Sequence, residues 1–503
     1  MFVRKKKNKS GVLSVQIIDK SSGKYKMIKT IGSSSDENKI EELVRLGKDW
    51  IKTKTHNLEF DFSGDRQTTE GVLNNIKQVN ISGTTLLLGK IFNIVGFDKI
   101  DSALFKNLVI QRMSFPASKL KTVDLLQRHQ SIDINVQEVY RYLDKLHSTH
   151  KELIQQISYQ HTLKILGNVI NIVFYDVTTL YFQIDDVDEI RKRGFSKEGR
   201  HQNPQIVLGL LVSVGGYPLS YEIFEGNKFE GHTMLPIIES FKVKYNLDKL
   251  VIVADSGLLS NQNIIDLQEK GYDFILGARI KNETDVIKEK ILSLKLRDGE
   301  SKVIDKQDSL RLIISHSDKR AKKDLYNRER GIEKLEKKVK SGKLTKSSIN
   351  NRGYNKYLKM EGEINVTIDR KKSDLDKKWD GLKGYMTNTS LSAKDIMENY
   401  AHLWKIEQAF RISKHDLKIR PIYHRLQRRI EAHITINFAS YKLYKELERQ
   451  LKAKGSDLSP EKAIEIAKTI YSIKVYIPSL KESITKTLII NDEQKYLVNL
   501  FDL

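Results

Sequence analysis

Three acidic residues occupy positions from which their carboxylates could reach a common centre. Asp176 and Asp255 each close a short apolar run, VINIVFYD and LVIVAD, that is typical of a buried strand. Glu407 lies in a helical pattern, on one stripe with Leu403 and Phe410, which should face inward. Carboxylates in such surroundings need a positive partner. A set of carboxylate oxygens without a His or Cys cluster suits Mg²⁺ or Mn²⁺.

Two such ions, about 3.5–4 Å apart, can bind both the attacking and the leaving oxygen of an in-line phosphoryl displacement. The sequence therefore predicts phosphodiester chemistry at these carboxylates. Each residue also has a simpler explanation. The stretches DVTT and DSGLLSN can each begin a turn that Asp176 or Asp255 caps, and Glu407 taken alone could be a surface residue of its helix.

A second set of residues near Glu407 suits contact with a polyanion. Tyr400, Glu407 and Lys414 are seven residues apart, which places them two helical turns apart on one stripe. Lys414 begins the basic run KHDLKIRPIYHRLQRR, which includes Arg420 and would make DNA binding steeply salt-dependent. Simple packing of Tyr400 and a solvated basic face around Lys414 remain alternatives, and His424 in this run is interpreted as packing or a phosphate contact.

The composition supports the same partner. The 503 residues carry a formal charge of +23, which indicates nucleic acid unless the lysines only make the surface soluble. The absence of cysteine excludes disulfides, thiolate metal sites and cysteine nucleophiles. MFVRKKKNKSG lacks the apolar segment of a signal peptide, and no apolar run approaches the ~20 residues that cross a bilayer. We therefore expect a cytoplasmic protein without a membrane partner.

The elements that must position the carboxylates follow from residues 168–278. Short apolar runs and helical patterns alternate there in the order β-β-β-α-β-α-β, with turn residues between them. This order predicts an α/β core with a mixed sheet. In open sheets of this kind, ligands bind beyond the carboxyl ends of the strands, where Asp176 and Asp255 are expected.

The flanking segments are less specific. Residues 1–32 read as a hairpin formed by VLSVQII and KYKMIKTI, and residues 118–146 as two amphipathic helices around a polar turn. The helix pair is either a helix-turn-helix DNA reader or an ordinary helical hairpin. Residues 319–359 contain 15 basic and 4 acidic residues, which predicts a solvated helix or a flexible arm. Helices should continue to about residue 472.

The order and spacing of these motifs resemble the DDE transposases of bacterial insertion sequences. The resemblance is to the group with a Tyr–Arg–Glu–Lys signature, insertion-sequence family four and its relatives. It is carried by FYDVTTLYF around Asp176, VADSG around Asp255, and Tyr400, Glu407 and Lys414. GFSKEGRHQNPQIVLGLLVSVGGYPLSYEIFEGN, DGLKGYMTNT and the N-terminal RKKKNKSGVLSVQIIDKSSGKYKMIKTIG also look familial, so the resemblance spans nearly the whole chain.

One signature residue is missing. The arginine expected three residues after Tyr400 is Leu403 in this chain. Lys405 or Arg411 would have to supply the charge. Lys405 should project off the stripe, whereas Arg411 lies one turn beyond Glu407 and is the preferred candidate.

The resemblance implies an RNase H-like mixed-sheet catalytic core with an inserted domain, an N-terminal β-hairpin and a helical DNA-binding region. Asp176, Asp255 and Glu407 would hold Mg²⁺ or Mn²⁺, two ions per site. The residues that would contact DNA are Tyr400, Lys414, Arg411, Lys405, Trp404 and Arg420. The implied domains are 1–55, N-terminal hairpin and helix; 56–165, helical and binding the transposon end; 166–280, first part of the core; 281–390, Lys-rich insertion; 391–430, core helix with the third carboxylate; and 431–503, helical and a candidate for dimerisation.

The implied reaction is cleavage of DNA at the ends of an insertion sequence, followed by strand transfer into target DNA. The partners would be double-stranded DNA, as terminal inverted repeats and as target, and a second copy of the chain when assembled on DNA. The protein would act in the bacterial cytoplasm, at the nucleoid. Two alternatives stay open: a metal-dependent nuclease or resolvase on the same fold without strand transfer, and a DNA-binding protein that performs no chemistry.

Overall fold

The computed structural model describes the chain except residues 9–10, 22, 55–71, 197–198, 248, 343, 345–347, 351–352, 362–364 and 479–480. The start of the predicted helical region 56–165 and parts of the Lys-rich run 319–359 therefore lie outside the described residues. The chain forms two compact units. One unit contains Met1–Gln78 and Lys474–Thr485, and the other contains Val79–Ile473 and Lys486–Leu503.

The first unit contains a three-stranded antiparallel sheet, β1 (Phe2–Lys7), β2 (Leu13–Asp19) and β3 (Lys26–Ser34), and helix α1 (Glu37–Lys54). The runs from which the hairpin was predicted form β2 and β3, and β2 is the buried central strand. β1 was not predicted, because its sequence FVRKKK has no apolar alternation. A lysine-rich edge strand is a common protection against pairing with other chains.

The second unit is built on an eight-stranded mixed sheet in the order β10-β11-β14-β9-β8-β5-β6-β7. β5, β6 and β7 are antiparallel, and β8 and β9 run parallel to β5. The predicted order β-β-β-α-β-α-β is confirmed by the elements β5 (Ile172–Tyr181), β6 (Gln205–Ser213), β7 (Pro218–Glu225), α8 (Met234–Tyr245), β8 (Val251–Ala254), α9 (Asn261–Glu269) and β9 (Asp273–Ala278).

Alternate residues of β5 face two separate cores. Val173 and Tyr175 point to the side covered by α8 and α9. Phe174 and Leu180 point to the side covered by α13 (Ala393–Ala401), α14 (Trp404–Arg411) and α15 (Gln427–Ala453). Since side chains alternate along a strand, Asp176 points to the same side as Phe174. The alternation of side chains along β5 thus directs the Asp176 carboxylate toward the side covered by α13, α14 and α15.

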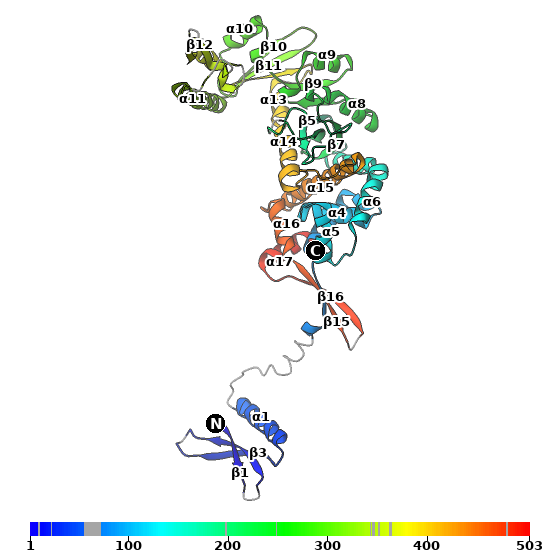
Figure 1. Ribbon diagram of the computed structural model, residues 1–503, viewed down its shortest axis with the longest axis vertical. Coiled ribbons are helices and arrows are strands. Elements are labelled where there is room, and N and C mark those ends of the chain that lie inside the picture. The colour runs from blue at the N-terminus through cyan, green and yellow to red at the C-terminus, as the bar shows by residue number, and fades with distance from the viewer. Residues whose placement is uncertain are drawn as a thin grey trace. The chain divides into compact units, whose positions relative to one another are not determined.

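Helix α15 is the centre of the second unit. It packs against β7 on one side and against the helices of residues 83–165 on the other (Figure 1). Those helices are α3 (Gly83–Val95), α4 (Ala103–Ser114), α5 (Lys119–Gln130), α6 (Val136–Lys145), the π-helical turn η2 (Leu146–His150) and α7 (Lys151–Ile165). The side chains of α15 from Ile430 to Leu447 are buried. This part of α15 therefore offers little surface for a second copy, and the dimerisation considered for residues 431–503 stays a prediction.

The amphipathic pair predicted within 118–146 corresponds to α5 and α6. Ser118 caps α5 by accepting a hydrogen bond from the Lys121 backbone N–H. Asn135 and Glu138 form a capping box at the start of α6. These caps fix both starts and leave a short connection, as the polar turn in the sequence indicated.

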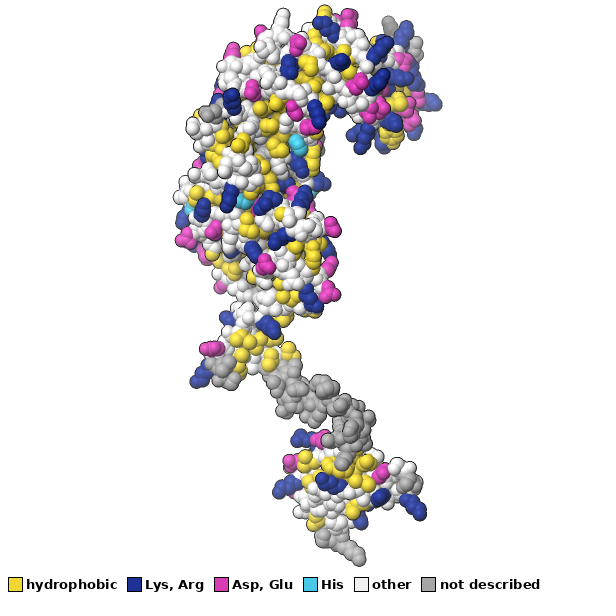
Figure 2. All heavy atoms as spheres, turned by 180° about the vertical axis from the view of Figure 1, so that it is seen from behind, with side chains coloured by type: hydrophobic (Ala, Val, Ile, Leu, Met, Phe, Trp, Pro, Cys, Tyr) yellow, Lys and Arg dark blue, Asp and Glu magenta, His cyan; other side chains and the backbone are white. Residues whose placement is uncertain are grey.

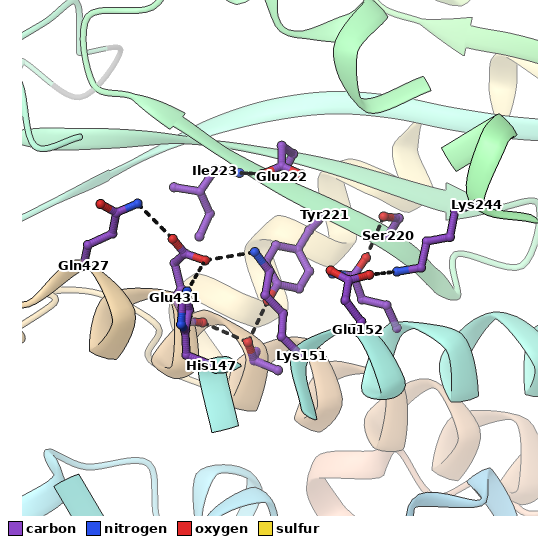
Figure 3. Close-up of polar contacts among 12 residues, drawn as sticks. His147, Lys151, Glu152, Ser220, Tyr221, Glu222, Ile223, Lys244, Gln427 and Glu431 are labelled. Atoms are coloured by element: carbon purple, nitrogen blue, oxygen red, sulfur yellow. Dashed lines mark hydrogen bonds and ion pairs between the residues drawn. The ribbon is translucent and has the colours of Figure 1, made fainter. Parts of the chain in front are cut away.

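A charged cluster ties α15 to the helical layer (Figure 3). The Glu431 carboxylate accepts hydrogen bonds from Lys151 at 2.9 Å and Gln427 at 3.0 Å, and His147 Nε2 lies 3.1 Å away. Burial acts to raise the pKa of Glu431, but Lys151, Gln427 and His147 oppose it and the net pKa is lowered. This carboxylate is therefore a stabilising contact between α7 and α15.

The range 281–390, predicted as one insertion, is divided between two structures. Three strands extend the main sheet beyond β9: β10 (Ser301–Asp305), β11 (Arg311–His316) and β14 (Leu382–Thr387). The remainder has its own small core, formed by α11 (Asp318–Lys340) with β12 (Leu358–Glu361) and β13 (Asn365–Ile368). α11 is the predicted solvated helix, and Figure 2 shows Lys and Arg side chains mixed with acidic ones over this part.

The prediction of helices throughout 431–503 is wrong in one segment. α16 (Pro460–Lys468) begins as SPEK indicates, with Ser459 as cap and Pro460 first. After it come two strands, β15 (Tyr471–Ile477) and β16 (Glu482–Leu488), which form a sheet with β4 (Ile76–Ile81), and then helix α17 (Asp492–Phe501). The alternation in YSIKVYI was the missed strand signal. Among the described residues, no helix is long and apolar enough to cross a membrane.

Candidate active site

Asp176 and Asp255 lie at neighbouring positions of two parallel strands. In the pairing of β5 with β8, Tyr175 is opposite Ala254, so the next residue of each strand is one of the two aspartates. Asp255 follows the end of β8, as predicted. Asp176, however, lies inside β5, which continues to Tyr181. The strand does not end at the carboxylate because VTTLY is itself rich in β-branched and aromatic residues.

Tyr400 of α13 holds the Asp255 carboxylate. The Tyr400 hydroxyl donates a hydrogen bond to Asp255 Oδ1 at 3.1 Å, and its side chain is only 7% exposed. Burial, followed by the charges of Asp255 and Glu407, raises the pKa of Tyr400. The hydroxyl therefore stays protonated and remains a donor. This hydrogen bond to a carboxylate was not predicted, and the expected DNA contact of Tyr400 stays a prediction.

Gly277 of β9 makes this contact possible. A Cβ at this position would overlap the Tyr400 hydroxyl and would lie 2.9 Å from the Ser256 backbone nitrogen. Any side chain would push Tyr400 away from Asp255. A glycine inside the strand run YDFILGAR indicates such a close approach, although the sequence does not show which group approaches.

Lys383 of β14 is the cation beside these residues, and the sequence interpretation did not single it out. Its ammonium lies 4.3 Å from the centroid of the Tyr400 ring and 5.2 Å from that of Tyr385. Burial, reinforced by Arg320, lowers the pKa of Lys383, while Asp255 and Glu407 act to raise it. Lys383 is therefore within electrostatic reach of two of the three predicted carboxylates.

Glu407 lies in the first turn of α14, where its charge also suits the helix dipole. The single helix expected around it is interrupted, because α13 ends at Ala401 and α14 begins at Trp404. α14 packs against β5 and β6 through an apolar side that includes Phe410, while Glu407 itself is exposed. The carboxylate thus stands at the edge of the stripe rather than within the core.

The donor set of the three carboxylates fits a hard divalent cation, since all ligands are oxygens and two come from adjacent strands. Among the described residues, however, no three acidic or His side chains are gathered closely enough to hold a metal ion. Asp176 also accepts a hydrogen bond from the Val177 backbone N–H at 2.8 Å. Binding of an ion by all three carboxylates therefore requires a rearrangement, for which the exposed Glu407 side chain is the best placed.

Neither candidate for the missing arginine is placed against Asp255. The Lys405 ammonium lies 3.9 Å from the centroid of the Trp404 ring. Its charged neighbours include Lys445 and Glu448 of α15: burial and Lys445 lower the pKa of Lys405, while Glu448 acts to raise it. Arg411 is exposed at the end of α14. The position expected of a signature cation next to the tyrosine is instead occupied by Lys383, from a strand rather than from the helix.

The basic run after Glu407 leaves the regular helix. Lys414 lies in a π-helical turn, η8 (Ile412–Asp416), so it is not on the straight stripe that seven-residue spacing predicts. Arg420 lies further along, with its guanidinium 5.5 Å from the centroid of the Tyr181 ring at the end of β5. Both residues are partly exposed.

A cavity of about 620 Å³ opens beside Asp255, since Ser256 and Lys383 belong to its lining. Its other wall is formed by residues of α11 and of the segments on either side of β12 and β13, including the aromatic residues Tyr354, Tyr357 and Trp379. Trp404, in contrast, is 49% exposed on α14. The cavity thus combines aromatic and basic side chains next to the predicted carboxylates.

Comparison with known proteins identifies the family. Residues 169–443, more than half of the chain, match the family described as the transposase DDE domain. The matched segment contains Asp176, Asp255 and Glu407. The chain belongs to this family, and it is therefore a transposase of the DDE type. A search of curated proteins found no match.

Three solved structures show a distant likeness. A piggyBac transposase synaptic complex with hairpin DNA gives a TM-score of 0.37 at 10% identity, with 73% of this chain and 78% of that chain covered. A Mos1 transposase paired-end complex with the left transposon end gives 0.16 at 9% identity, covering 34% and 58%. A Mos1 mariner paired-end complex with Mn gives 0.15 at 11% identity, covering 45% and 77%. The family assignment rests on the sequence match.

Proposed function

We propose that this transposase cuts DNA at the ends of a bacterial insertion sequence and joins the cut ends to target DNA. The observation that carries the proposal is the placement of Asp176 and Asp255 at neighbouring positions of β5 and β8, within the family segment. Three antiparallel strands followed by two parallel ones would make this core RNase H-like. The protein would act at the nucleoid in the bacterial cytoplasm.

Asp176, Asp255 and Glu407 would hold Mg²⁺ or Mn²⁺, two ions per site, as the donor set favours. Bound ions would activate the attacking hydroxyl and offset charge on the phosphate that reacts. Glu407 would approach the two aspartates when the site is loaded. Its exposure and the shortness of α14 leave it free to do so.

The other residues would orient the site and the DNA. Tyr400 would keep Asp255 in one rotamer, and the Lys383 ammonium would offset the charge of carboxylates and phosphate together. Lys414 and Arg420 would contact backbone phosphates on the same strand. Trp379, in the cavity beside Asp255, would stack on an unpaired base.

The reaction would have two steps. A water oxygen loses a proton and forms a bond to phosphorus at the end of the element, the bond from phosphorus to the 3′ oxygen breaks, and that oxygen takes a proton. The freed 3′-hydroxyl then loses its proton and attacks a target phosphate, and the 3′ oxygen of the target leaves and takes a proton. No net phosphodiester bond is lost in the second step, so it needs no energy source. Two DNA ends would require two copies of the chain.

The test uses the full chain and DNA that contains the boundaries of the element encoding it, with Mg²⁺ or Mn²⁺ and a supercoiled target. We expect cut ends and joined donor–target products. Asp176→Asn, Asp255→Asn and Glu407→Gln should each abolish both products and retain DNA binding. The matched control is Glu398→Gln, an exposed carboxylate of α13 that pairs with Lys394 and should leave both products unchanged.

The products also decide between the alternatives. Free ends without joined DNA would identify a nuclease or resolvase, and no product with either ion would identify a DNA-binding protein. Full cleavage by Glu407→Gln would remove this residue from the site.

A further inference from the structure

A second basic site lies away from the predicted carboxylates. A cavity of about 360 Å³ is enclosed by the end of α4, the start of α5 and the segment that precedes α15. Its lining includes four cationic side chains, Arg112, Lys119, Lys418 and Arg420. None of the described residues that line it is Asp or Glu. A cavity lined by this charge and by none of the described acidic side chains suits an anion.

Two of these cations are buried. Arg112 and Lys119 are each only 5% exposed. Arg112 donates two long hydrogen bonds, both 3.4 Å, to the backbone oxygens of Leu417 and Lys418. In the described part of the chain, the Lys119 ammonium has no hydrogen bond and no ion pair. Buried charges are normally paired, so an unpaired lysine in a cavity points to a missing partner.

Two histidines that line the cavity lie in positive surroundings. His433 Nε2 lies 2.9 Å from the backbone oxygen of Ile419, so this nitrogen carries the proton and donates. Its buried Nδ1 is therefore an acceptor and offers no hydrogen bond to an anion. Burial, with Lys119 and Arg112, lowers the pKa of His433, and the same causes lower that of His424 to about 3. An anion in the cavity would relieve this concentration of positive charge.

The backbone supports the same ligand. Ser118 and Lys119 form the cap and first residue of α5, a helix of 12 residues, and both line the cavity. The first turn of a helix presents unpaired N–H groups and a positive dipole end, which favour phosphate. The helix start, the buried lysine and the buried arginine thus line one cavity.

The cluster around Glu431 provides a direct contrast (Figure 3). There a cation from the same helical layer, Lys151, is 2.9 Å from a carboxylate of α15. The fold therefore neutralises a half-buried cation with an acidic residue where neutralisation serves stability. At Lys119 no such residue is supplied.

We infer that this cavity binds a phosphate group of the DNA strand that continues from the active site, an inference that rests on the proposed function. Arg420 connects the two places, because it lines the cavity and lies over Tyr181 at the end of β5. Asp176 is five residues before Tyr181, about 16 Å along a strand.

The first measurement is DNA binding without divalent ions, so that cleavage plays no part. Lys119→Met should weaken binding and reduce the slope of log K against log salt by about 0.9, the contribution of one phosphate. The same variant should raise Tm without DNA, because it removes a buried amino group that has no partner in the described part of the chain and whose pKa burial and Arg112 lower. A purely structural lysine would instead lower Tm. The matched control is Lys151→Met, which breaks a pair with Glu431 and should lower Tm and leave the salt slope unchanged.

The second measurement uses inorganic phosphate as the probe and the wild-type chain, in case the variant does not fold. Phosphate should raise Tm above that in chloride of equal ionic strength, and DNA containing the element end should compete with it. A phosphate effect without DNA competition, or an unchanged salt slope for a folded Lys119→Met, would overturn the assignment to DNA. No effect of phosphate would overturn the site itself. If Lys119→Met changes the salt slope but the wild-type chain never cuts DNA, the phosphate site is retained and the proposed reaction is rejected.

Discussion

The phenol of Tyr400 and the carboxylate of Asp255 are joined by a 3.1 Å hydrogen bond across 145 positions of the chain. It connects α13 to the end of β8, so the position of a candidate metal ligand depends on a helix that follows the last strand of the sheet. Tyr400 is buried and its pKa is raised, so its hydroxyl stays protonated and can donate to Asp255. A residue that touches Asp255 in this way acts on the reaction through the orientation of that carboxylate.

Tyr400→Phe should reduce the rate of DNA cleavage without unfolding the protein. The substitution removes one hydrogen bond to a charged acceptor, a contribution of about 1.5–3 kcal/mol, so we expect a loss of about 10- to 100-fold at limiting Mg²⁺. The measurement is the single-turnover cleavage rate against metal concentration. Since orientation rather than charge is lost, a higher metal concentration should recover part of the rate. A wild-type metal dependence in the variant would contradict this role.

Gly277→Ala should damage the site through Tyr400. The added Cβ would collide with the Tyr400 hydroxyl and crowd the Ser256 nitrogen, so we expect lower Tm and cleavage at least as weak as that of Tyr400→Phe. The double variant should lose less than the sum of the two single losses, because both act on one contact. Gly89→Ala is the control. Its Cβ would meet only the flexible end of Lys106, so Tm should not fall. Strict additivity would show that Gly277 acts elsewhere.

Lys383→Met should separate metal binding from catalysis. Removal of a cation near Asp255 and Glu407 should tighten metal binding, because the ammonium no longer competes for the carboxylates. At saturating metal, cleavage should still fall about tenfold, since a charge that offsets the reacting phosphate is lost. Lys383→Arg should restore much of the rate. Equal metal affinity in all three proteins would place Lys383 outside the electrostatics of the site.

Glu431→Gln should change how stability depends on pH. The folded-state pKa of Glu431 is lowered, so its stabilisation is present above the unfolded-state pKa of about 4.3 and is lost as pH falls through the folded-state value. The variant should be less stable by about 1–2 kcal/mol at pH 7 and should converge with the wild type near pH 3. The measurement is Tm from pH 3 to 7.

The control for Glu431 is Glu152→Gln. Glu152 pairs with Lys244 at the surface, with 70% of its side chain exposed, and such pairs contribute little. The Tm of Glu152→Gln should equal that of the wild type from pH 3 to 7. A parallel displacement of the Glu431→Gln curve, without convergence in acid, would mean that packing rather than charge is lost.

Local patterns were sufficient for much of this protein. The run of elements from β5 to β9, the aspartate after β8, the start of α16 and the helical nature of α11 all follow from periodicity, caps and composition. These signals succeed because the periodicity of a strand or helix depends only on residues that are close together in the sequence. They failed where a strong neighbouring pattern concealed a weaker one, as at β15, and where one charged residue suggested the end of a strand, as at Asp176.

The sequence by itself determined that three carboxylates, a basic surface and a mixed sheet occur together. Only the tertiary structure decided which groups meet them. It placed Lys383 rather than Lys405 or Arg411 beside Tyr400, used Tyr400 for Asp255, and left Lys119 in a cavity without an acid. The physical reason is that these contacts join residues far apart in the chain. The pairing of distant strands and the packing of helices on a sheet fix such contacts, and neither is encoded in local spacing.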